Sequence, residues 1–469
     1  MIDTSGSFDV RAKMKIPKSP PPMEDCLKQM AEMGISAERR SEIQRTVQMA
    51  NDKYLHWHKF RFHPIPDGWE PQAAWGAVAI SRLMQMRKLP ITLYKENEQL
   101  QFWVPPQHQE WLHRIDKEAG GSVVGVQTRY GIPDDDEKYL VGSLMEEAIA
   151  SSQLEGASTT REAAKRMLQM NKKPKDRSEQ MILNNYRAIQ EIRDLKSARL
   201  TKSLLCHLQG VITEDTLDNP DHCGRFRNND DDPIVVSDNY GEVLHTPPPP
   251  DQIEWRFQEL CDFVNKKSNP FIHPVIKAIV LHFALGFLHP FNDGNGRTAR
   301  AMFYWFMLKR GYWMFEYLPI SRIFLNAPVK YANAYLFTET DSGDLTYFTN
   351  YHLGVIRRAI SELQEYMDAQ QRELKAVSNI LDKYPGLNHR QITLVSDALK
   401  STAPMYTVAQ HAGKANVTKA TARTDLNKLV DLGLFTKQQN GKRWVFFPVE
   451  RLAKTVTSLA KRAARRAEL

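Results

Sequence analysis

One segment near the middle of the chain, LHPFNDGNGRTARAMF, constrains the fold more than any other. It follows the longest apolar run, Val275 to Phe291, which is too polar and too short to span a bilayer and therefore predicts a buried helix. Pro290 ends that helix. Gly294 and Gly296 then allow a backbone path with positive φ and leave room for a ligand close to the main chain. We expect a second helix from about Arg297.

The side chains around this loop are those that a polyphosphate requires. The free N–H groups and the positive end of the second helix form an anion site. Arg297 and Arg300 are three residues apart, so they share one face near that end and add positive charge. Asp293 is placed to hold a magnesium ion that bridges phosphate oxygens. His289, at the entrance to the loop, is placed to take a proton from an incoming hydroxyl.

The pattern from His289 to Arg300, His-Pro-Phe-x-Asp-Gly-Asn-Gly-Arg-x-x-Arg, resembles the signature of Fic-domain proteins at all nine specified positions. The resemblance implies that His289 is the general base, that Phe291 packs the loop into the core and that Asp293 binds Mg²⁺ or Mn²⁺. It also implies a set of residues that bind the phosphates of ATP, namely Gly294, Asn295, Gly296, Arg297 and Arg300.

The implied reaction is adenylyl transfer. A hydroxyl of Tyr, Ser or Thr, in a target protein or in the chain itself, attacks the α-phosphorus of ATP, and pyrophosphate leaves. Relatives that transfer the terminal phosphate look as if they carry Lys where this chain has Gly296, so Gly296 favours AMP transfer. UMP or another diphosphate-linked donor remains open.

Upstream, Ser151-x-x-x-Glu155-Gly156 resembles the inhibitory motif of the same family, on a helix expected over about 141–156. Glu155 falls at the C-terminal end of that helix, where the dipole disfavours a carboxylate and a cationic partner would offset the cost. The resemblance names Arg300 as that partner. A Glu155–Arg300 pair would occupy the γ-phosphate position.

Between the two motifs, Pro233 to Val243 predicts a β-hairpin, at the place where the family keeps a flap that docks the target by main-chain pairing. The docking residues would be Ile234, Val235 and Val236. Tyr331 and Tyr335, further on, either wall an adenine pocket or pack in the core. Thr159-x-x-Glu162 is a capping-box signature that predicts a helix start.

We expect a mainly α protein: a Fic helical core with a β-hairpin flap, a helical N-terminal region and a C-terminal winged helix-turn-helix domain. The predicted boundaries are 1–133 for the N-terminal region, 134–378 for the catalytic core and 379–469 for the winged helix with a basic tail. The first 20 residues are rich in Pro and Lys and predict a poorly ordered segment.

Charge is unevenly distributed along the chain. Residues 390–469 hold fifteen Lys and Arg against five Asp and Glu, or +10, so the rest of the chain carries −2 of the total of +8. The order helix, helix, helix, hairpin in this region is that of a winged helix. It predicts DNA contact through residues 407–445, with protein docking or dimerisation as the alternatives.

Four scattered cysteines without a CxxC pair, and a beginning without an apolar run, predict a cytoplasmic protein with no membrane partner. The leading interpretation is an autoinhibited protein adenylyltransferase that uses ATP and Mg²⁺ and acts on an unknown target, with a homo-oligomer possible. The first alternative is a DNA-binding regulator that uses the Fic core as a nucleotide sensor. The second is removal of AMP at the same site.

Overall fold

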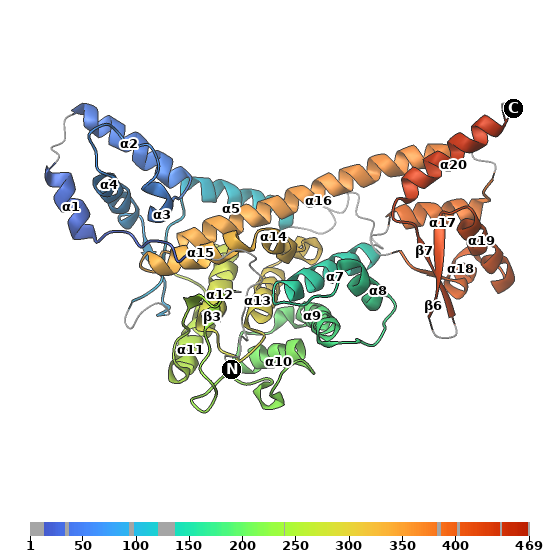
Figure 1. Ribbon diagram of the computed structural model, residues 1–469, viewed down its shortest axis with the longest axis horizontal. Helices are drawn as coiled ribbons and strands as arrows, with labels where there is room; N and C mark the ends of the chain where they lie inside the picture. Colours follow the sequence, from blue (N-terminus) through green and yellow to red (C-terminus); the bar gives the residue numbers. More distant parts are fainter. Residues whose placement is uncertain are drawn as a thin grey trace.

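The protein is mostly helical with a few short strands, as the sequence predicts. The computed structural model describes residues 14–32, 37–92, 98–120, 137–238, 240–381, 386–400, 404–440 and 443–467. Figure 1 shows an elongated molecule with the N-terminal helices at one end, a central helical body and a C-terminal unit at the other end. The long helix α16 (Thr346–Leu381) runs along the body and joins the two ends.

The N-terminal region packs around aromatic side chains that include Trp57, Phe60 and Trp75. Two short strands of this region pair antiparallel, and residues 93–97, between them in the sequence, lie outside the described residues. The elements are α1 (Met23–Glu32), α2 (Ala37–Asp52), α3 (Trp57–Phe60), α4 (Pro71–Leu83), β1 (Arg87–Lys88), β2 (Gln101–Phe102) and α5 (Pro106–Ala119).

The central body surrounds two consecutive helices, α12 (Pro274–Leu288) and α13 (Asn295–Lys309). Nearly every residue of both is buried, which explains why α12 is apolar on all sides. The surrounding elements are α7 (Glu137–Gln153), α8 (Arg161–Gln169), α9 (Arg177–Asp194), α10 (Lys202–Thr213), β3 (Val236–Ser237), β4 (Val243–His245), α11 (Ile253–Asn265), α14 (Ile320–Asn326) and α15 (Pro328–Thr340).

The loop between α12 and α13 is tighter than the sequence predicts. The second helix begins at Asn295 rather than at Arg297, because Gly294 already acts as its N-cap residue with a φ of 83°. A positive φ was expected at both loop glycines, and only Gly294 has one, since Gly296 lies within the first turn of α13. Gly296 is required instead because a side chain at this position would collide with the carboxylate of Glu155.

Two further local expectations are wrong. The N-cap of α8 is Thr160 rather than Thr159, and its hydroxyl accepts a hydrogen bond from Ala163, so the expected capping box does not form. The second is the poor order expected over the first 20 residues: residues 1–13 lie outside the described residues, but the part that follows them is well packed. From residue 14 onward it lies against the body, with Met14 and Pro17 buried.

The C-terminal unit has the element order that the sequence predicts, with Thr407 and Thr418 as helix caps. Its three strands pair in the order β5-β7-β6, and the assignment as a winged helix stays a prediction. No helix in the described ranges is long and apolar enough to cross a membrane. The elements are α17 (His389–Lys400), β5 (Tyr406–Thr407), α18 (Val408–Ala415), α19 (Lys419–Asp431), β6 (Phe435–Asn440), β7 (Arg443–Pro448) and α20 (Leu452–Ala467).

A buried arginine joins the N-terminal helices to the body. Arg82 on α4 is 3% exposed and donates to the carbonyls of Ala50 and Leu55 at 3.1 and 3.0 Å. It also donates to the hydroxyl of Tyr347 on α16 at 2.8 Å. Tyr347 in turn donates to Asp341 at 2.7 Å, and burial raises the pKa of that carboxyl to about 6.

We expect Arg82→Ala to lower the free energy of unfolding by about 3 kcal/mol, because it removes the buried hydrogen bonds that Arg82 donates to the carbonyls of Ala50 and Leu55 and to the hydroxyl of Tyr347. The measurement is thermal denaturation together with hydrogen exchange in α4. Arg87→Ala, an exposed arginine on β1, is the matched control. Equal effects of the two substitutions would contradict this role.

Candidate active site

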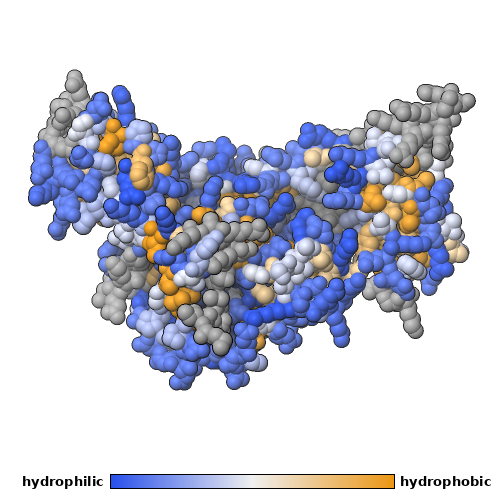
Figure 2. Space-filling model, viewed as in Figure 1, coloured by the Kyte–Doolittle hydropathy of each residue, from blue (hydrophilic) through white to orange (hydrophobic). Residues whose placement is uncertain are grey.

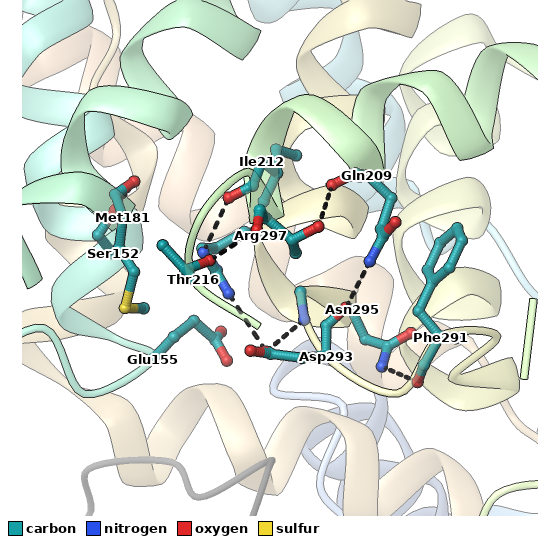
Figure 3. A network of polar contacts seen from close by, with 12 residues as sticks. Ser152, Glu155, Met181, Gln209, Ile212, Thr216, Phe291, Asp293, Asn295 and Arg297 are labelled. Carbon is teal, nitrogen blue, oxygen red and sulfur yellow. Dashed lines mark hydrogen bonds and ion pairs between the residues drawn. The ribbon is translucent and has the colours of Figure 1, made fainter. Parts of the chain in front are cut away.

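The loop that joins α12 to α13 is held by side chains rather than by regular structure. Asn295 accepts a hydrogen bond from the N–H of Phe291 at 2.9 Å and donates to the Phe291 carbonyl at 2.6 Å. The Phe291 ring is fully buried and meets Phe226 edge-on, with ring centroids 5.5 Å apart. Gln209 on α10 donates to the carbonyl of Asp293 at 3.1 Å (Figure 3). The Asn295 side chain is used to shape the loop. The main-chain N–H of Asn295 is therefore the group of this residue that is left to bind an anion.

His289 ends α12 in the left-handed conformation, with a φ of 46°. Its Nδ1 lies 3.0 Å from the carbonyl of Gly286, and a carbonyl only accepts, so Nδ1 carries the proton. Nε2 is therefore the free acceptor, as a general base requires. Burial lowers the pKa of His289 to about 4, and the nearby positive charges of His245 and Arg227 act in the same direction. The ring is thus neutral near pH 7.

Two cationic side chains that the sequence did not single out hold the end of α12. Arg227 donates from Nε to the carbonyl of His289 at 2.8 Å, and from Nη2 to the carbonyl of Leu288 at 3.4 Å. His245, on strand β4, donates from Nε2 to the carbonyl of Phe287 at 2.8 Å. Cations at a helix C-terminus satisfy its last carbonyls and its dipole. Both therefore anchor the start of the α12–α13 loop, and His245 links it to β4.

His245 is held as an imidazolium. Its second ring nitrogen, Nδ1, lies 2.7 Å from a carboxylate oxygen of Glu339 on α15, so both nitrogens face acceptors. Burial by itself would lower the pKa of His245, but Glu339 and the Phe287 carbonyl outweigh it and raise the pKa. Because these partners lie 42 and 94 residues away, no local pattern could have identified this residue.

The two arginines of the loop signature are buried to 1% exposure. Arg297 donates to the carbonyl of Ile212 at 3.1 Å and to the carboxylate of Asp293 at 3.2 Å, and Figure 3 shows these contacts. Within the described ranges its Nε has no hydrogen-bond partner. A buried donor without a partner beside a helix N-terminus is suited to a phosphate oxygen.

Arg300 is engaged by the segment that resembles an inhibitory motif. Its Nε donates to the hydroxyl of Ser151 at 2.9 Å, and its Nη2 donates to the Ser151 carbonyl at 2.8 Å. The same Nη2 lies 2.9 Å from a carboxylate oxygen of Glu155. Ser151 lies in the last turn of α7, so Arg300 also satisfies a carbonyl at that helix end.

The Glu155 carboxylate also lies against the first turn of α13. A Cβ placed on Gly296 would overlap its Oε1 and would lie 2.9 Å from its Cδ. Gly296 is therefore required for close approach rather than for backbone conformation. The N-terminus of α13, where an anion is favoured, is the place that this carboxylate occupies.

Asp293 supplies a carboxylate from within the loop itself. Its Oδ1 accepts hydrogen bonds from Arg297 and from the N–H of Gly294, and its Oδ2 lies 3.7 Å from Arg177 on α9. Among the described residues no group of three acidic, His or Cys side chains could hold a metal ion. Mg²⁺ needs no such group, because it binds through one carboxylate together with substrate phosphates and water. Asp293 fits that requirement.

A single pocket brings most of the predicted site together. His289, Asp293 to Gly296 and Glu155 line it, together with Val236 of the flap. Ile234 and Val235, the other two predicted docking residues, precede β3 and do not line the pocket.

Two tyrosines of α15 form one wall of this pocket. Tyr331 is 1% exposed and its ring stacks on Phe324 at 4.3 Å. Tyr335 stacks on Phe283 and lies so close to Gly286 that a Cβ there would meet its ring. Both tyrosines therefore pack in the core and border the pocket as well.

Comparison with known proteins places this site in a family. Residues 199–307 match the model of the Fic/DOC family, and the protein therefore contains a Fic domain. It is 33% identical over 93 residues to the protein adenylyltransferase Fic of Nematostella vectensis, which covers 20% of each chain. It is 30% identical over 134 residues to the protein adenylyltransferase fic-1 of Caenorhabditis elegans, which covers 29% of this chain and 24% of that protein.

These matches thus span about a quarter or less of the length of the curated relatives. Among solved structures, a Fic family protein from Desulfovibrio desulfuricans G20 aligns over 73% of this chain and 96% of that chain, with 18% identity and a TM-score of 0.46.

The contact between Gly296 and Glu155 gives a test of the site geometry. We expect Gly296→Ala to destabilise the protein by about 1–3 kcal/mol, because the new methyl group forces Glu155 away from Arg300. In a Glu155→Gly background most of that cost should disappear, because the nearest remaining atom is Nη1 of the Arg300 side chain, at 3.1 Å. The measurement is a double-mutant cycle by thermal denaturation.

Gly354→Ala in α16, where a Cβ meets nothing within 4 Å, is the matched control and should be neutral or stabilising in both backgrounds. An equal cost of Gly296→Ala with and without the Glu155 carboxylate would show that the two residues do not interact.

Proposed function

We propose that the protein is an autoinhibited protein adenylyltransferase that transfers AMP from ATP to a hydroxyl of a target protein or of its own chain. One observation carries the proposal. The Ser151–Glu155 segment and Arg300 are paired at the N-terminus of α13, where the loop signature predicts the phosphates of ATP.

The reaction uses groups that the loop already orients. His289, neutral and with Nε2 free, takes the proton of the attacking hydroxyl. The oxygen forms a bond to the α-phosphorus, and the bond from that phosphorus to the bridging oxygen of pyrophosphate breaks. Main-chain N–H groups of Asn295 and Gly296, with Arg297, stabilise the charge on the phosphates, and the N–H of Gly294, which donates to Asp293, would join them once that carboxylate binds the cation. Positioning and charge stabilisation supply most of the acceleration in such transfers.

A divalent cation is the remaining requirement. Mg²⁺ or Mn²⁺ held by Asp293 would neutralise phosphate charge and assist departure of pyrophosphate. Arg297 and Arg177 now share that carboxylate, so both would turn to the nucleotide when the ion binds.

The inhibitory contact comes from the Glu155 side chain, and the helix that precedes it is fixed in the core. Glu147, one turn before Ser151 on α7, is 3% exposed and accepts hydrogen bonds from Tyr304 at 2.8 Å and from the N–H of Ser321 at 2.9 Å. These bonds fix α7 to α13 and α14, so removing the helix would break the core. Relief of inhibition is therefore expected to move the Glu155 side chain alone.

Two other functions are alternatives to this proposal. Removal of AMP would need a water that Glu155 orients toward a modified target. A DNA-binding regulator is favoured by the exposed face of α19, which carries Lys419, Arg423 and Lys428. Absence of AMP incorporation by every variant, with retained ATP binding, would favour the regulator.

We expect Glu155→Gly to raise AMP incorporation by more than about tenfold, since one charged hydrogen bond contributes about 1.5–3 kcal/mol. Glu155→Asp should give a smaller rise. Arg300→Ala breaks the same pair and should not activate, because Arg300 also binds ATP. The measurement is incorporation from α-labelled ATP with Mg²⁺, and Glu162→Gly on α8 is the control. Equal incorporation by wild type and Glu155→Gly would contradict autoinhibition.

We expect His289→Ala in the Glu155→Gly background to lower transfer by about 10²–10⁴-fold, with ATP affinity unchanged. Because burial holds the pKa of His289 near 4, kcat/KM should stay flat between neutral pH and pH of about 5 and fall as the base is protonated below it. ATP binding at each pH is the control. A fall centred near pH 6.5, the ordinary value for histidine, would show that the ring is solvated.

A further inference from the structure

Two buried histidines form a polar chain inside the hydrophobic core of the central body. His282 on α12 and His352 on α16 are 0% and 1% exposed. His352 Nε2 lies 3.1 Å from His282 Nδ1, and His282 Nε2 lies 2.8 Å from the hydroxyl of Tyr331 on α15. At the other end, His352 Nδ1 lies 3.0 Å from the carbonyl of Phe348. The chain therefore begins on α16 and ends in the wall of the active-site pocket.

The positions of the protons follow from the fixed end of this chain. The Phe348 carbonyl only accepts, so His352 Nδ1 carries a proton. Burial lowers the pKa of His352 to about 3 and holds the pKa of His282 well below its usual value, so both rings are neutral near pH 7. His282 Nδ1 then donates to His352 Nε2, and His282 Nε2 accepts the hydroxyl proton of Tyr331. Tyr331 therefore offers only lone pairs to its other neighbours.

Arg300 is one of those neighbours. Burial raises the pKa of the Tyr331 hydroxyl, and the positive charge of Arg300 opposes that rise, as do hydrogen bonds from Tyr335 and Arg300. On its other side, Nη1 of Arg300 lies 3.1 Å from the Cβ position of Gly296, in the first turn of α13. The guanidinium thus lies between a hydroxyl that only accepts and the helix end that is suited to phosphate.

We propose that His282 is a positioning residue, which acts through Tyr331 to hold Arg300 toward the γ-phosphate of ATP. This inference rests on the proposed function. A phenol can turn its proton toward any acceptor, and His282 draws that proton away from the pocket. The neutral oxygen that remains orients the guanidinium without cancelling its charge. That charge is then available to the nucleotide once Glu155 has moved.

The test measures binding of ATP and of ADP to the full chain in the Glu155→Gly background, by titration calorimetry. Tyr331→Phe keeps the ring that stacks on Phe324 and removes the hydroxyl. Affinity for ATP should fall about tenfold or more, because a hydrogen bond to a charged group is lost. Affinity for ADP, which lacks the γ-phosphate, should not change. In AMP transfer the same loss should appear in KM for ATP with kcat unchanged.

Tyr351→Phe is the matched control. The Tyr351 ring also stacks on Phe324, and its hydroxyl is buried without a hydrogen-bond partner among the described residues, so ATP affinity should stay the same. His282→Phe should lower ATP affinity as Tyr331→Phe does. The two substitutions together should cost no more than one, because both break the same link.

A variant at the far end of the chain tests the same link if His282→Phe does not fold in thermal denaturation. His352→Phe removes the acceptor of His282 Nδ1, so that His282 can carry its proton on Nε2 instead. Tyr331 would then turn its own proton toward Arg300. ATP affinity should fall and ADP affinity should not, although His352 does not line the pocket.

Arg300→Ala in the same background separates this inference from the proposed function. If it lowers ATP affinity while the Tyr331 and histidine variants leave the ratio of ATP to ADP affinity unchanged, the chain only stabilises the core and the inference is wrong. Equal losses for ATP and ADP in Tyr331→Phe would contradict it as well. If Arg300→Ala does not lower ATP affinity, Arg300 does not bind the γ-phosphate, and the proposed phosphate site fails together with this inference.

Discussion

The structure depends on the tight connection between α12 and α13. Two left-handed residues, His289 and Gly294, reverse the chain within a few residues, and the one that is not glycine costs roughly 1–2 kcal/mol of backbone strain. Burial of Phe291 and the paired hydrogen bonds of Asn295 offset that cost. The result places a neutral imidazole at the end of one helix beside the free N–H groups of the next.

Charge at the helix ends explains why Arg300 and Glu155 pair where α7 ends and α13 begins. Arg300 lies at the C-terminal end of α7, where a cation is favoured, and Glu155 lies at the N-terminal end of α13, where an anion is favoured. Each residue therefore satisfies a helix end as well as its partner. On the function proposed here, ATP competes with this pairing, because its phosphates would use the same donors.

The flap is tied to the body at both of its strands. His245 bonds β4 to α12 and α15, while Asp238, just beyond β3, holds the N-terminal segment. Figure 2 shows a largely hydrophilic surface on the face in view, with hydrophobic colour gathered at the C-terminal unit and below α15. The hydrogen bonds of His245 and Asp238 therefore bring together segments that are far apart in the sequence.

What the sequence determined was local. Proline, glycine and the apolar run predicted α12 and the loop after it, and the resemblance of a short upstream motif to the family's inhibitory motif named Arg300 as the partner of Glu155. These signals depend on neighbours within a few residues. The tertiary structure decided the rest. The first turn of α13 begins early because Gly294 caps it, and Gly296 is needed because Glu155 lies against it.

Arg227, Gln209 and His245 escaped sequence analysis for one physical reason. Each is an ordinary polar residue in its own segment, and its importance comes from backbone groups of α12 and of the loop after it that are 42 to 84 residues away. Met14, 224 residues from Asp238, is the extreme case. Side-chain chemistry sets which contacts are possible, but only the folded chain selects the partners.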